Sequence, residues 1–266
     1  MRRGLRRWAA APAIIAAATL TVVVPALACS AVEEPAVRVA AVPEPLVLTL
    51  ADGRSVRLAG VTLAGLEEAG GSSSRTALAE IALGRDVRLA PVGAGPDRYG
   101  RLVARVERAD DGADVAVALA AAGAALAGGA PRDDGCGRPV LVAEAVARRA
   151  RRGGWADGTF SIFSAGDPEL AASAGRYVIV EGRVLSVGRA GRVHYLNFGR
   201  RWTLDFTVVI AESDAQALEQ AGFAPASLAG ARVRVRGWLE ARDGGQVQLT
   251  RPSDIERLGK RIGTGG

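Results

Sequence analysis

Short apolar runs separated by turn residues dominate the chain from residue 46 onward, a pattern typical of a β-rich protein. Two of these runs, at 46–50 and 56–58, flank the turn dipeptide Asp52-Gly53, which predicts a β-hairpin. Helix-like stretches lie between the later runs. The elements predicted for this first region are strands at 46–50, 56–58, 87–89 and 99–106 and helices at 75–83, 115–126 and 140–152.

Local signals define the expected ends of these helices. Three serines at 72–74 can accept hydrogen bonds from the free amides of a helix start, so they are predicted to cap the helix at 75–83. Gly84 follows that helix and is a typical stop. The helix at 140–152 is amphipathic and has arginines at its C-terminal end, where they favour the helix dipole. The first region is therefore expected to be a small barrel with helices.

The second half of the chain has a similar pattern with fewer helical stretches. Five strands and one helix in this order suit an OB-type barrel. The expected fold class is therefore mainly β with helices (α+β), with two barrels in succession. The elements predicted here are strands at 177–187, 193–198, 206–210, 231–239 and 247–249 and a helix at 213–221.

Proline, glycine and alanine content indicates where the folded regions begin and end. The predicted layout is a signal sequence at 1–28, a linker at 29–45, a first domain at 46–156, a second linker at 157–174, an OB-type domain at 175–258 and a flexible tail at 259–266.

Residues 1–28 have the composition of an export signal, with a basic stretch, an apolar run at 8–24 and Ala-Leu-Ala at 26–28. Pro12 and Pro25 interrupt the apolar run and no stop-transfer segment follows, which favours cleavage over a membrane-spanning anchor. The protein is expected to be exported, whether to a periplasm, to a membrane as a lipoprotein or to the medium.

Cys29 stands directly after this segment, where a bacterial lipoprotein carries its lipid. Pro25 and Ala26 make a poor lipidation signal, so lipidation and plain release both stay open. Cys29 is thus a candidate lipidation or cleavage site, and lipid or the signal itself is the expected route to a membrane. The other cysteine, Cys136, can pair with Cys29 in an oxidising compartment if Cys29 is not lipidated, and an inert thiol is an equal alternative.

Charge changes this picture little. The whole chain has a net charge of +6, but removing residues 1–28, which hold four arginines and no acid, leaves 30 bases against 28 acids. The mature protein is nearly neutral, and its preference for arginine over lysine is as consistent with a GC-rich genome as with phosphate recognition. One histidine and two cysteines exclude a zinc site of soft ligands. Any metal site must be built from carboxylates.

Two motifs carry a resemblance to a known family. Residues 52–61 (DGRSVRLAGV) resemble the strand of the staphylococcal nuclease (thermonuclease) family that ends in Arg-x-Arg-Leu-x-Gly-Ile, and residues 97–102 (DRYGRL) resemble its Asp-Lys/Arg-Tyr-Gly-Arg motif. The helix at 75–83 lies between them and the run at 143–155 closes the region. The resemblance covers residues 46–156 and implies a nuclease-like barrel of the OB type.

The resemblance implies two catalytic arginines and a calcium ion held by carboxylates. Arg57 and Arg101 occupy the positions of the arginines, with surface arginines as the alternative interpretation. The carboxylates are missing, because Thr62 stands at the metal-ligand aspartate and Gly65 at the glutamate. Residues 42–45 replace the family's Asp-Gly-Asp-Thr. No metal site and no cofactor is therefore expected, and Ca²⁺ only if nuclease activity is retained.

Two acids lie just beyond the lost glutamate. Glu67 and Glu68 are candidate replacements for the missing carboxylates, although an Ala-Gly-Leu-Glu-Glu-Ala-Gly stretch is more often a solvated loop or helix start.

The second domain resembles a module appended to some bacterial thermonuclease-like proteins, through the segments 195–199 (YLNFG), 205–207 (DFT), 235–238 (VRGW) and 249–256 (LTRPSDIE). OB barrels bind single strands by stacking bases on aromatic side chains beside basic residues. The candidate nucleic-acid-binding residues of this kind are Tyr195, Arg200, Arg201 and Trp202. Strand alternation requires that some aromatics of this region are core residues instead.

Two classes of function follow. The first is a catalytically impaired relative that binds single-stranded nucleic acid or an envelope component. The second is an active secreted phosphodiesterase that uses Arg57 and Arg101 with non-standard carboxylates. The acids around Arg57 discriminate between them.

Overall fold

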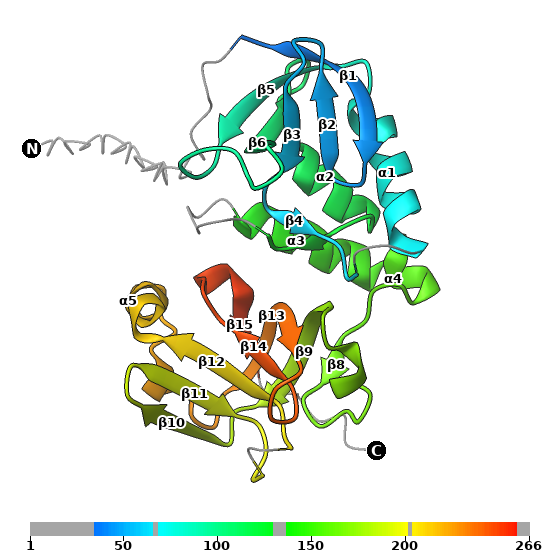
Figure 1. Ribbon diagram of the computed structural model, residues 1–266. Helices are drawn as coiled ribbons and strands as arrows, with labels where there is room; N and C mark the ends of the chain where they lie inside the picture. Colours follow the sequence, from blue (N-terminus) through cyan, green and yellow to red (C-terminus); the bar gives the residue numbers. More distant parts are fainter. Residues whose placement is uncertain (1–34, 66–68, 130–136, 202–203, 260–266) are drawn as a thin grey trace, which may run out of the picture.

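A computed structural model describes residues 35–65, 69–129, 137–201 and 204–259. Two β-rich domains lie one above the other, with helices of the first domain beside the junction (Figure 1). The fold is mainly β with helices, as predicted. Among the described residues, no helix is both long and apolar enough to cross a bilayer.

The first domain is a closed barrel of five strands in the order β1-β2-β3-β6-β5. The predicted hairpin is confirmed, since β2 and β3 pair antiparallel on either side of Asp52-Gly53. β3 runs parallel to β6, and β1 closes the ring by pairing with both β2 and β5. The strands are β1 (Val37–Glu44), β2 (Val47–Leu50), β3 (Ser55–Leu58), β5 (Asp86–Pro91) and β6 (Leu102–Arg108).

The linker predicted over 29–45 is wrong in its second part, because Val37–Glu44 is barrel strand β1. Prolines at 43 and 45 suggested a tether, but Pro43 lies near the end of a strand that has bulges, where the ladder tolerates the loss of an amide. The predicted strand at 99–106 also begins later, at Leu102, because Tyr99 and Gly100 form a turn.

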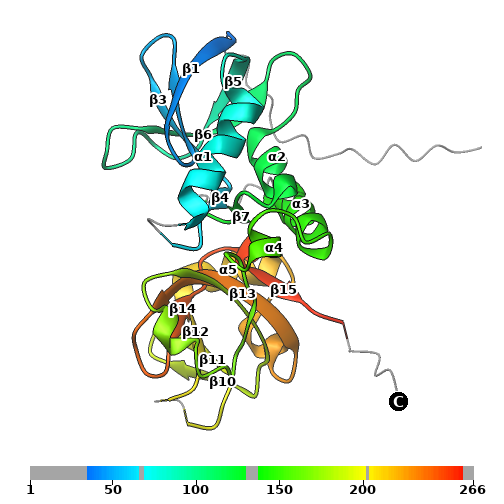
Figure 2. The same ribbon diagram turned by 90° about the vertical axis from the view of Figure 1, so that its right-hand side faces the viewer.

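Helices pack against one side of this barrel (Figure 2). The serines at 72–74 lie inside α1 and do not cap it, since the helix begins at Ala69. Asp114 caps α2 by accepting the Val117 amide, and Gly123 ends it in the left-handed conformation. The helices are α1 (Ala69–Ala82), α2 (Val115–Ala122), α3 (Gly137–Arg149) and α4 (Gly154–Asp157), and a small sheet pairs β4 (Val61–Thr62) with β7 (Leu126–Ala127).

The second domain is an eight-stranded sheet with the main order β10-β11-β12-β14-β13-β9-β8 and with β15 paired to β13. One helix, α5 (Glu212–Gln220), follows β12. Three short 3-10 helices, at Ala171–Ser173, Pro225–Leu228 and Pro252–Asp254, join the strands. The strands are β8 (Phe163–Ser164), β9 (Tyr177–Arg183), β10 (Ser186–Ala190), β11 (Val193–Asn197), β12 (Thr207–Ala211), β13 (Arg232–Glu240), β14 (Gln246–Gln248) and β15 (Ile255–Arg257).

The two sheets share one plan. β9 and β10 are consecutive stretches of one segment, so the second sheet curls back on itself, as Figure 2 shows. Counting β9–β10 as one strand, both domains have the order 1-2-3-5-4-1, a parallel pair between strands 3 and 5, and a helix after strand 3. This is the order of a five-stranded Greek-key barrel.

The predicted linker at 157–174 is folded. β8 pairs with β9, and Phe160 packs with Leu126 of the first domain and with Tyr177 and Ile179 of the second. This interdomain cluster is separate from the apolar cores of the two barrels. The segment is therefore part of the contact between the domains.

Candidate functional site

A pocket of about 750 Å³ opens where the first barrel meets the second domain. Most of its wall comes from the end of β1 and the turn that follows it, from β3, from β4 and its following loop, and from the turn before β6. One residue comes from β13 of the second domain. The lining residues are Glu44, Pro45, Leu46, Ser55, Arg57, Thr62, Leu63, Gly65, Arg98, Tyr99, Arg101 and Trp238.

Arg57 lies in the middle of β3, and strand alternation sends it to this pocket. Its neighbours Val56 and Leu58 are buried in the barrel core, so Arg57 faces the other side. Burial lowers the pKa of its guanidinium, and the nearby charge of Arg101 lowers it further, while Asp97 raises it. Arg57 makes no hydrogen bond or ion pair with any residue that the structure describes. It is a partly desolvated cation to which no acid of the described ranges is bound.

Arg101 is held by the turn that precedes β6. The Asp97 carboxylate accepts a hydrogen bond from the Arg101 side chain at 2.9 Å. It also accepts hydrogen bonds from the backbone amides of Tyr99 and Arg101 at 2.9 and 3.0 Å. Burial opposes ionisation of Asp97, but these hydrogen bonds hold its pKa below the usual range. Glu44 lies 3.3 Å from the Arg101 guanidinium on the other side. The structure thus brings Arg57 and Arg101 to one pocket, and the turn orients Arg101.

Tyr99 adds an exposed aromatic ring to the rim. It is 64 % exposed, and the guanidinium groups of Arg98 and Arg101 each lie 4.7 Å from its ring centre. Arg98 also donates a hydrogen bond to the Tyr99 hydroxyl at 2.7 Å. The rim is therefore cationic and aromatic together.

Among the described residues of the second domain, one lines the same pocket and another lies against its wall. Trp238 lines it and is 44 % exposed. Arg176 lies against Gly65, since a side chain at position 65 would meet its guanidinium at 3.4 Å. The pocket wall that the family resemblance assigns to a glutamate is thus open backbone beside an arginine.

Comparison with known families agrees with this geometry. The family model of the staphylococcal nuclease homologues matches residues 55–157, which include β3, the Asp97–Arg101 turn and the helices. The chain carries a staphylococcal nuclease homologue domain. No curated protein matches the chain.

The nuclease family is calcium-dependent in general, and the residues of this pocket do not fit that ion. Calcium takes six to eight oxygen ligands, with carboxylates prominent among them. Here Thr62 is almost fully buried, Gly65 has no side chain, and Asp97 and Glu44 are engaged with Arg101. Within the described ranges, no three His, Cys, Asp or Glu side chains form a group that could hold a metal.

Several predicted site residues lie outside the described residues. These are Glu67, Glu68, Trp202 and Cys29, together with Cys136. The replacement role of Glu67 and Glu68 therefore stays a prediction.

The remaining candidates of the second domain do not join this pocket. Tyr195 lies in β11 and lines a separate groove of about 610 Å³, together with Asn197, Arg189 and Arg242. Arg200 and Arg201 are exposed in the loop after β11 and are not among the described residues that line either cavity. Phe198 packs against the second core, as alternation along the strand predicted.

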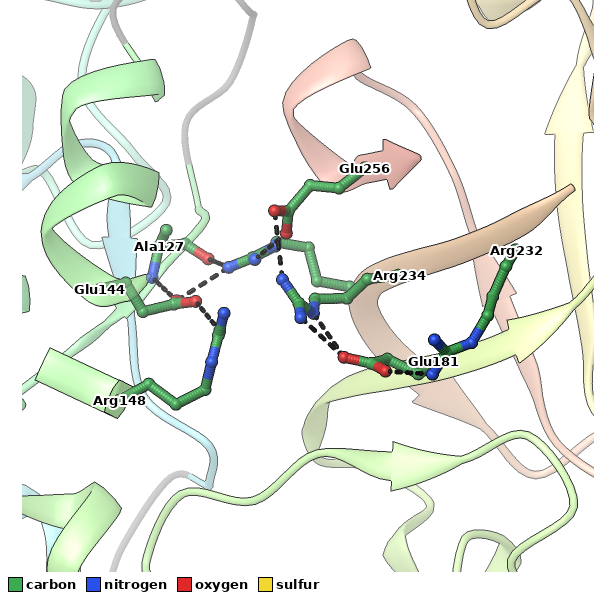
Figure 3. Close-up of polar contacts among 8 residues, drawn as sticks. Ala127, Glu144, Arg148, Glu181, Arg232, Arg234 and Glu256 are labelled. Carbon is green, nitrogen blue, oxygen red and sulfur yellow. Dashed lines mark hydrogen bonds and ion pairs between the residues drawn. The ribbon is translucent and has the colours of Figure 1, made fainter. Parts of the chain in front are cut away.

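An ion-pair network across the domain junction was missed by the sequence analysis (Figure 3). Its centre is Arg236 of β13, only 2 % exposed, which donates to Glu144 of α3 and to Glu256 of β15, each at 2.8 Å. The sequence feature that could have predicted it is the run Arg232-Val-Arg-Val-Arg236, in which both valines face the second core and the arginines face outward. The alternating chain of charges is Arg232, Glu181, Arg234, Glu256, Arg236, Glu144 and Arg148.

Backbone groups complete this junction. The Ala127 amide donates to Glu144 at 2.8 Å, and the Ala127 carbonyl accepts from the Tyr177 hydroxyl at 3.2 Å and from Arg236 at 3.3 Å. Burial would lower the pKa of Arg236, but the facing Glu144 carboxylate raises it, so the guanidinium stays charged. The two domains are therefore joined by a buried, fully paired contact that fixes how Trp238 approaches the pocket.

Proposed function

We propose that this protein binds the phosphate backbone of nucleic acid in the pocket of Arg57 and Arg101 and does not cleave it with calcium. The observation that carries the proposal is the composition of the pocket. Both arginines of the nuclease pattern face it, while Thr62 and Gly65 stand where that pattern has carboxylates.

Phosphate is the ligand that this charge arrangement favours. A guanidinium presents a planar fork of donors that matches the oxygens of a phosphate. Arg57 has no acid bound to it among the described residues, and the charge of Arg101 disfavours its ionised form. An anion placed between the two guanidinium groups removes that repulsion and supplies the missing hydrogen-bond partner.

Binding without chemistry follows from the same residues. A calcium ion in such a site would polarise the phosphate and position the attacking water. Losing the ion's carboxylate ligands removes both effects, whereas the arginines alone still hold the backbone. The proposed cellular setting is outside the cytoplasm, because the sequence of residues 1–28 has the composition of an export signal. An anionic envelope polymer is the alternative ligand.

Fluorescence anisotropy with a labelled single-stranded oligonucleotide tests the proposal on the full-length protein, with calcium and then with chelator. We expect binding of equal strength in both conditions and about tenfold weaker binding for Arg57→Ala and for Arg101→Ala. The matched control is Arg85→Ala, which removes an exposed arginine paired with Asp110 outside the pocket. Two phosphate contacts predict a slope of about −1.4 for log affinity against log salt concentration.

Two results would overturn the proposal. One is equal affinity of Arg57→Ala and the control, which would place nucleic acid elsewhere or nowhere. The other is calcium-dependent shortening of the oligonucleotide by the wild type that both pocket variants lose.

A metal-dependent phosphodiesterase with displaced acids is the second candidate. Glu44 favours it, because its carboxylate lines the pocket and touches Arg101. Cleavage abolished by Glu44→Gln as well as by chelator would establish this function in place of the first.

A further inference from the structure

Trp238 is an unusual residue to leave uncovered. Its strand neighbours Gly237 and Leu239 are buried, while the indole itself is 44 % exposed at the wall of the arginine pocket. Aromatic side chains of this size contribute most when they are buried against a partner. An exposed indole beside two guanidinium groups therefore indicates a ligand that has both an anionic and a flat aromatic part.

The Trp238 indole is held in its orientation by a contact with Tyr177. Tyr177 pairs with Trp238 across β9 and β13, and their rings meet edge to face with centres 5.7 Å apart. Tyr177 is itself buried, and its hydroxyl donates to the Ala127 carbonyl of the first domain at 3.2 Å. The indole thus rests on a residue that is hydrogen-bonded to the other domain.

Contacts between the two domains also determine how far the Trp238 indole lies from Arg57 and Arg101. Arg236 lies two residues before Trp238 on the same face of β13, and it is paired with Glu144 of the first domain at 2.8 Å. The Tyr177 amide donates to the Ala64 carbonyl at 3.0 Å, one residue before Gly65 in the pocket wall. These contacts hold the part of the pocket that Trp238 supplies against the part that Arg57 supplies.

We propose that Trp238 is a base-stacking residue, so that the two domains together form a pocket selective for single-stranded nucleic acid. This inference rests on the proposed binding of phosphate by Arg57 and Arg101. A backbone phosphate lies on the arginines and the adjoining base stacks on the indole. Single strands can turn a base outward to do this, whereas the bases of a duplex are already stacked and paired. The stack does not depend on which base is present, because every base has a π-face.

The test compares single-stranded and duplex oligonucleotides of one sequence on the full-length protein by anisotropy. We expect Trp238→Ala to weaken single-strand binding about five- to hundredfold and to leave duplex binding unchanged. Trp238→Phe, which keeps a ring against Tyr177, should recover most of the loss. An abasic single strand should bind the wild type and Trp238→Ala equally.

Tyr195→Ala is the matched control, because it removes a half-buried aromatic ring from the separate groove of the second domain. We expect it to leave the preference for single strands intact. A preference lost in Tyr195→Ala and kept in Trp238→Ala would overturn the inference and assign base binding to that groove.

The two proposals can fail separately. If Arg57→Ala weakens binding while Trp238→Ala leaves the preference for single strands unchanged, the stacking role is wrong and phosphate binding stands. If Arg57→Ala has no effect, phosphate binding in this pocket is wrong and the stacking role fails with it. Thermal unfolding of Trp238→Phe identifies any loss that comes from misfolding, since this variant keeps the contact with Tyr177.

Discussion

The barrel of the first domain and the sheet of the second have one strand order and use their outer faces differently. In the first, an outward arginine on β3 and the turn before β6 line the arginine pocket. In the second, the outward face of β13 carries Arg232, Arg234 and Arg236, which are paired with acids at the domain junction. The same alternation of core and outward residues therefore places an arginine in a pocket of the first domain and a row of arginines on a contact surface of the second.

The outward arginines of the two domains also differ in their ion-pair partners. Arg57 has no acid partner among the described residues, whereas Arg236 has two carboxylates and a carbonyl. An unpaired cation that is partly open to solvent attracts a ligand, and a paired buried one stabilises a contact. The following predictions test this difference.

Arg236→Met is expected to have the largest effect. It removes the closer ion-pair partner of the buried Glu144 and leaves it Arg148 at 3.3 Å, so the free energy of unfolding should fall by about 3–5 kcal/mol in urea denaturation. Replacing both partners, as Glu144→Leu with Arg236→Met, should cost less than the single change because the buried carboxylate is removed together with its guanidinium. Arg85→Met, at an exposed pair, is the control and should change stability by about 0.5 kcal/mol or less. A double variant with a lower free energy of unfolding than the single variant would refute this account of the junction.

Gly128→Ala tests the junction through packing. A methyl group there would lie 2.2 Å from the Tyr177 hydroxyl, and the backbone has a φ of +151°. The side chain of Tyr177 must move and lose its bond to Ala127, so we expect a loss of about 1–3 kcal/mol, measured by thermal unfolding. Gly53→Ala, in an open hairpin turn with a φ of +86°, measures the backbone strain alone. Equal losses in the two variants would show that Tyr177 does not limit the fit.

The helices α2 and α5 offer a third comparison between the domains, at their N-terminal caps. Asp114 caps α2 in the first domain, while Ala211 precedes α5 in the second without a side-chain hydrogen bond. Asp114→Ala should lower the free energy of unfolding by about 1 kcal/mol, and Ala211→Ser should raise the stability of the second domain by a similar amount. Urea denaturation followed by circular dichroism measures both changes, and a gain from Asp114→Ala would contradict the assigned cap.

The smallest effect should come from pH. Burial raises the pKa of Glu256, but Arg236 and Arg234 outweigh it and hold this pKa below its ordinary value of 4.5. A carboxyl with a depressed folded-state pKa stabilises the fold above its unfolded value and loses that contribution as pH falls through the folded value. Glu256→Gln should therefore be less stable than the wild type by at most about 1 kcal/mol near neutral pH, with the difference vanishing in acid. A difference that grows in acid would have the wrong sign.

Much of the fold could be predicted from apolar periodicity alone. The hairpin around Asp52, the strands β11 to β14 and the helix α5 appear where the pattern expected them, because each depends on neighbouring residues. The strand predicted at 177–187 is divided into β9 and β10, and β8 and β15 were not predicted. Periodicity failed where distant residues decide. Pro43 belongs to a strand because β2 pairs with the residues on either side of it, Ala41 and Glu44, and Phe160 is buried because it packs with Leu126 and Tyr177.

In the candidate site, too, some residues could be predicted from local sequence and others depend on contacts between distant residues. Two motifs placed Arg57 and Arg101 in one site and showed the missing carboxylates, since strand alternation and turn geometry are local properties. Trp238 and Arg176 could not be assigned to that site, because no local sequence pattern indicates that they lie near Arg57 in the folded protein.

Two β-rich domains and a nuclease-like motif set without its usual acids can be read from residue order. The packing of the domains adds that β13 faces the first domain, that Glu144 and Arg236 are buried together, and that an indole from one domain shares a pocket with arginines of the other. The physical reason is that patterning specifies which face of a strand is apolar, whereas the partner of the other face depends on how two finished surfaces fit together.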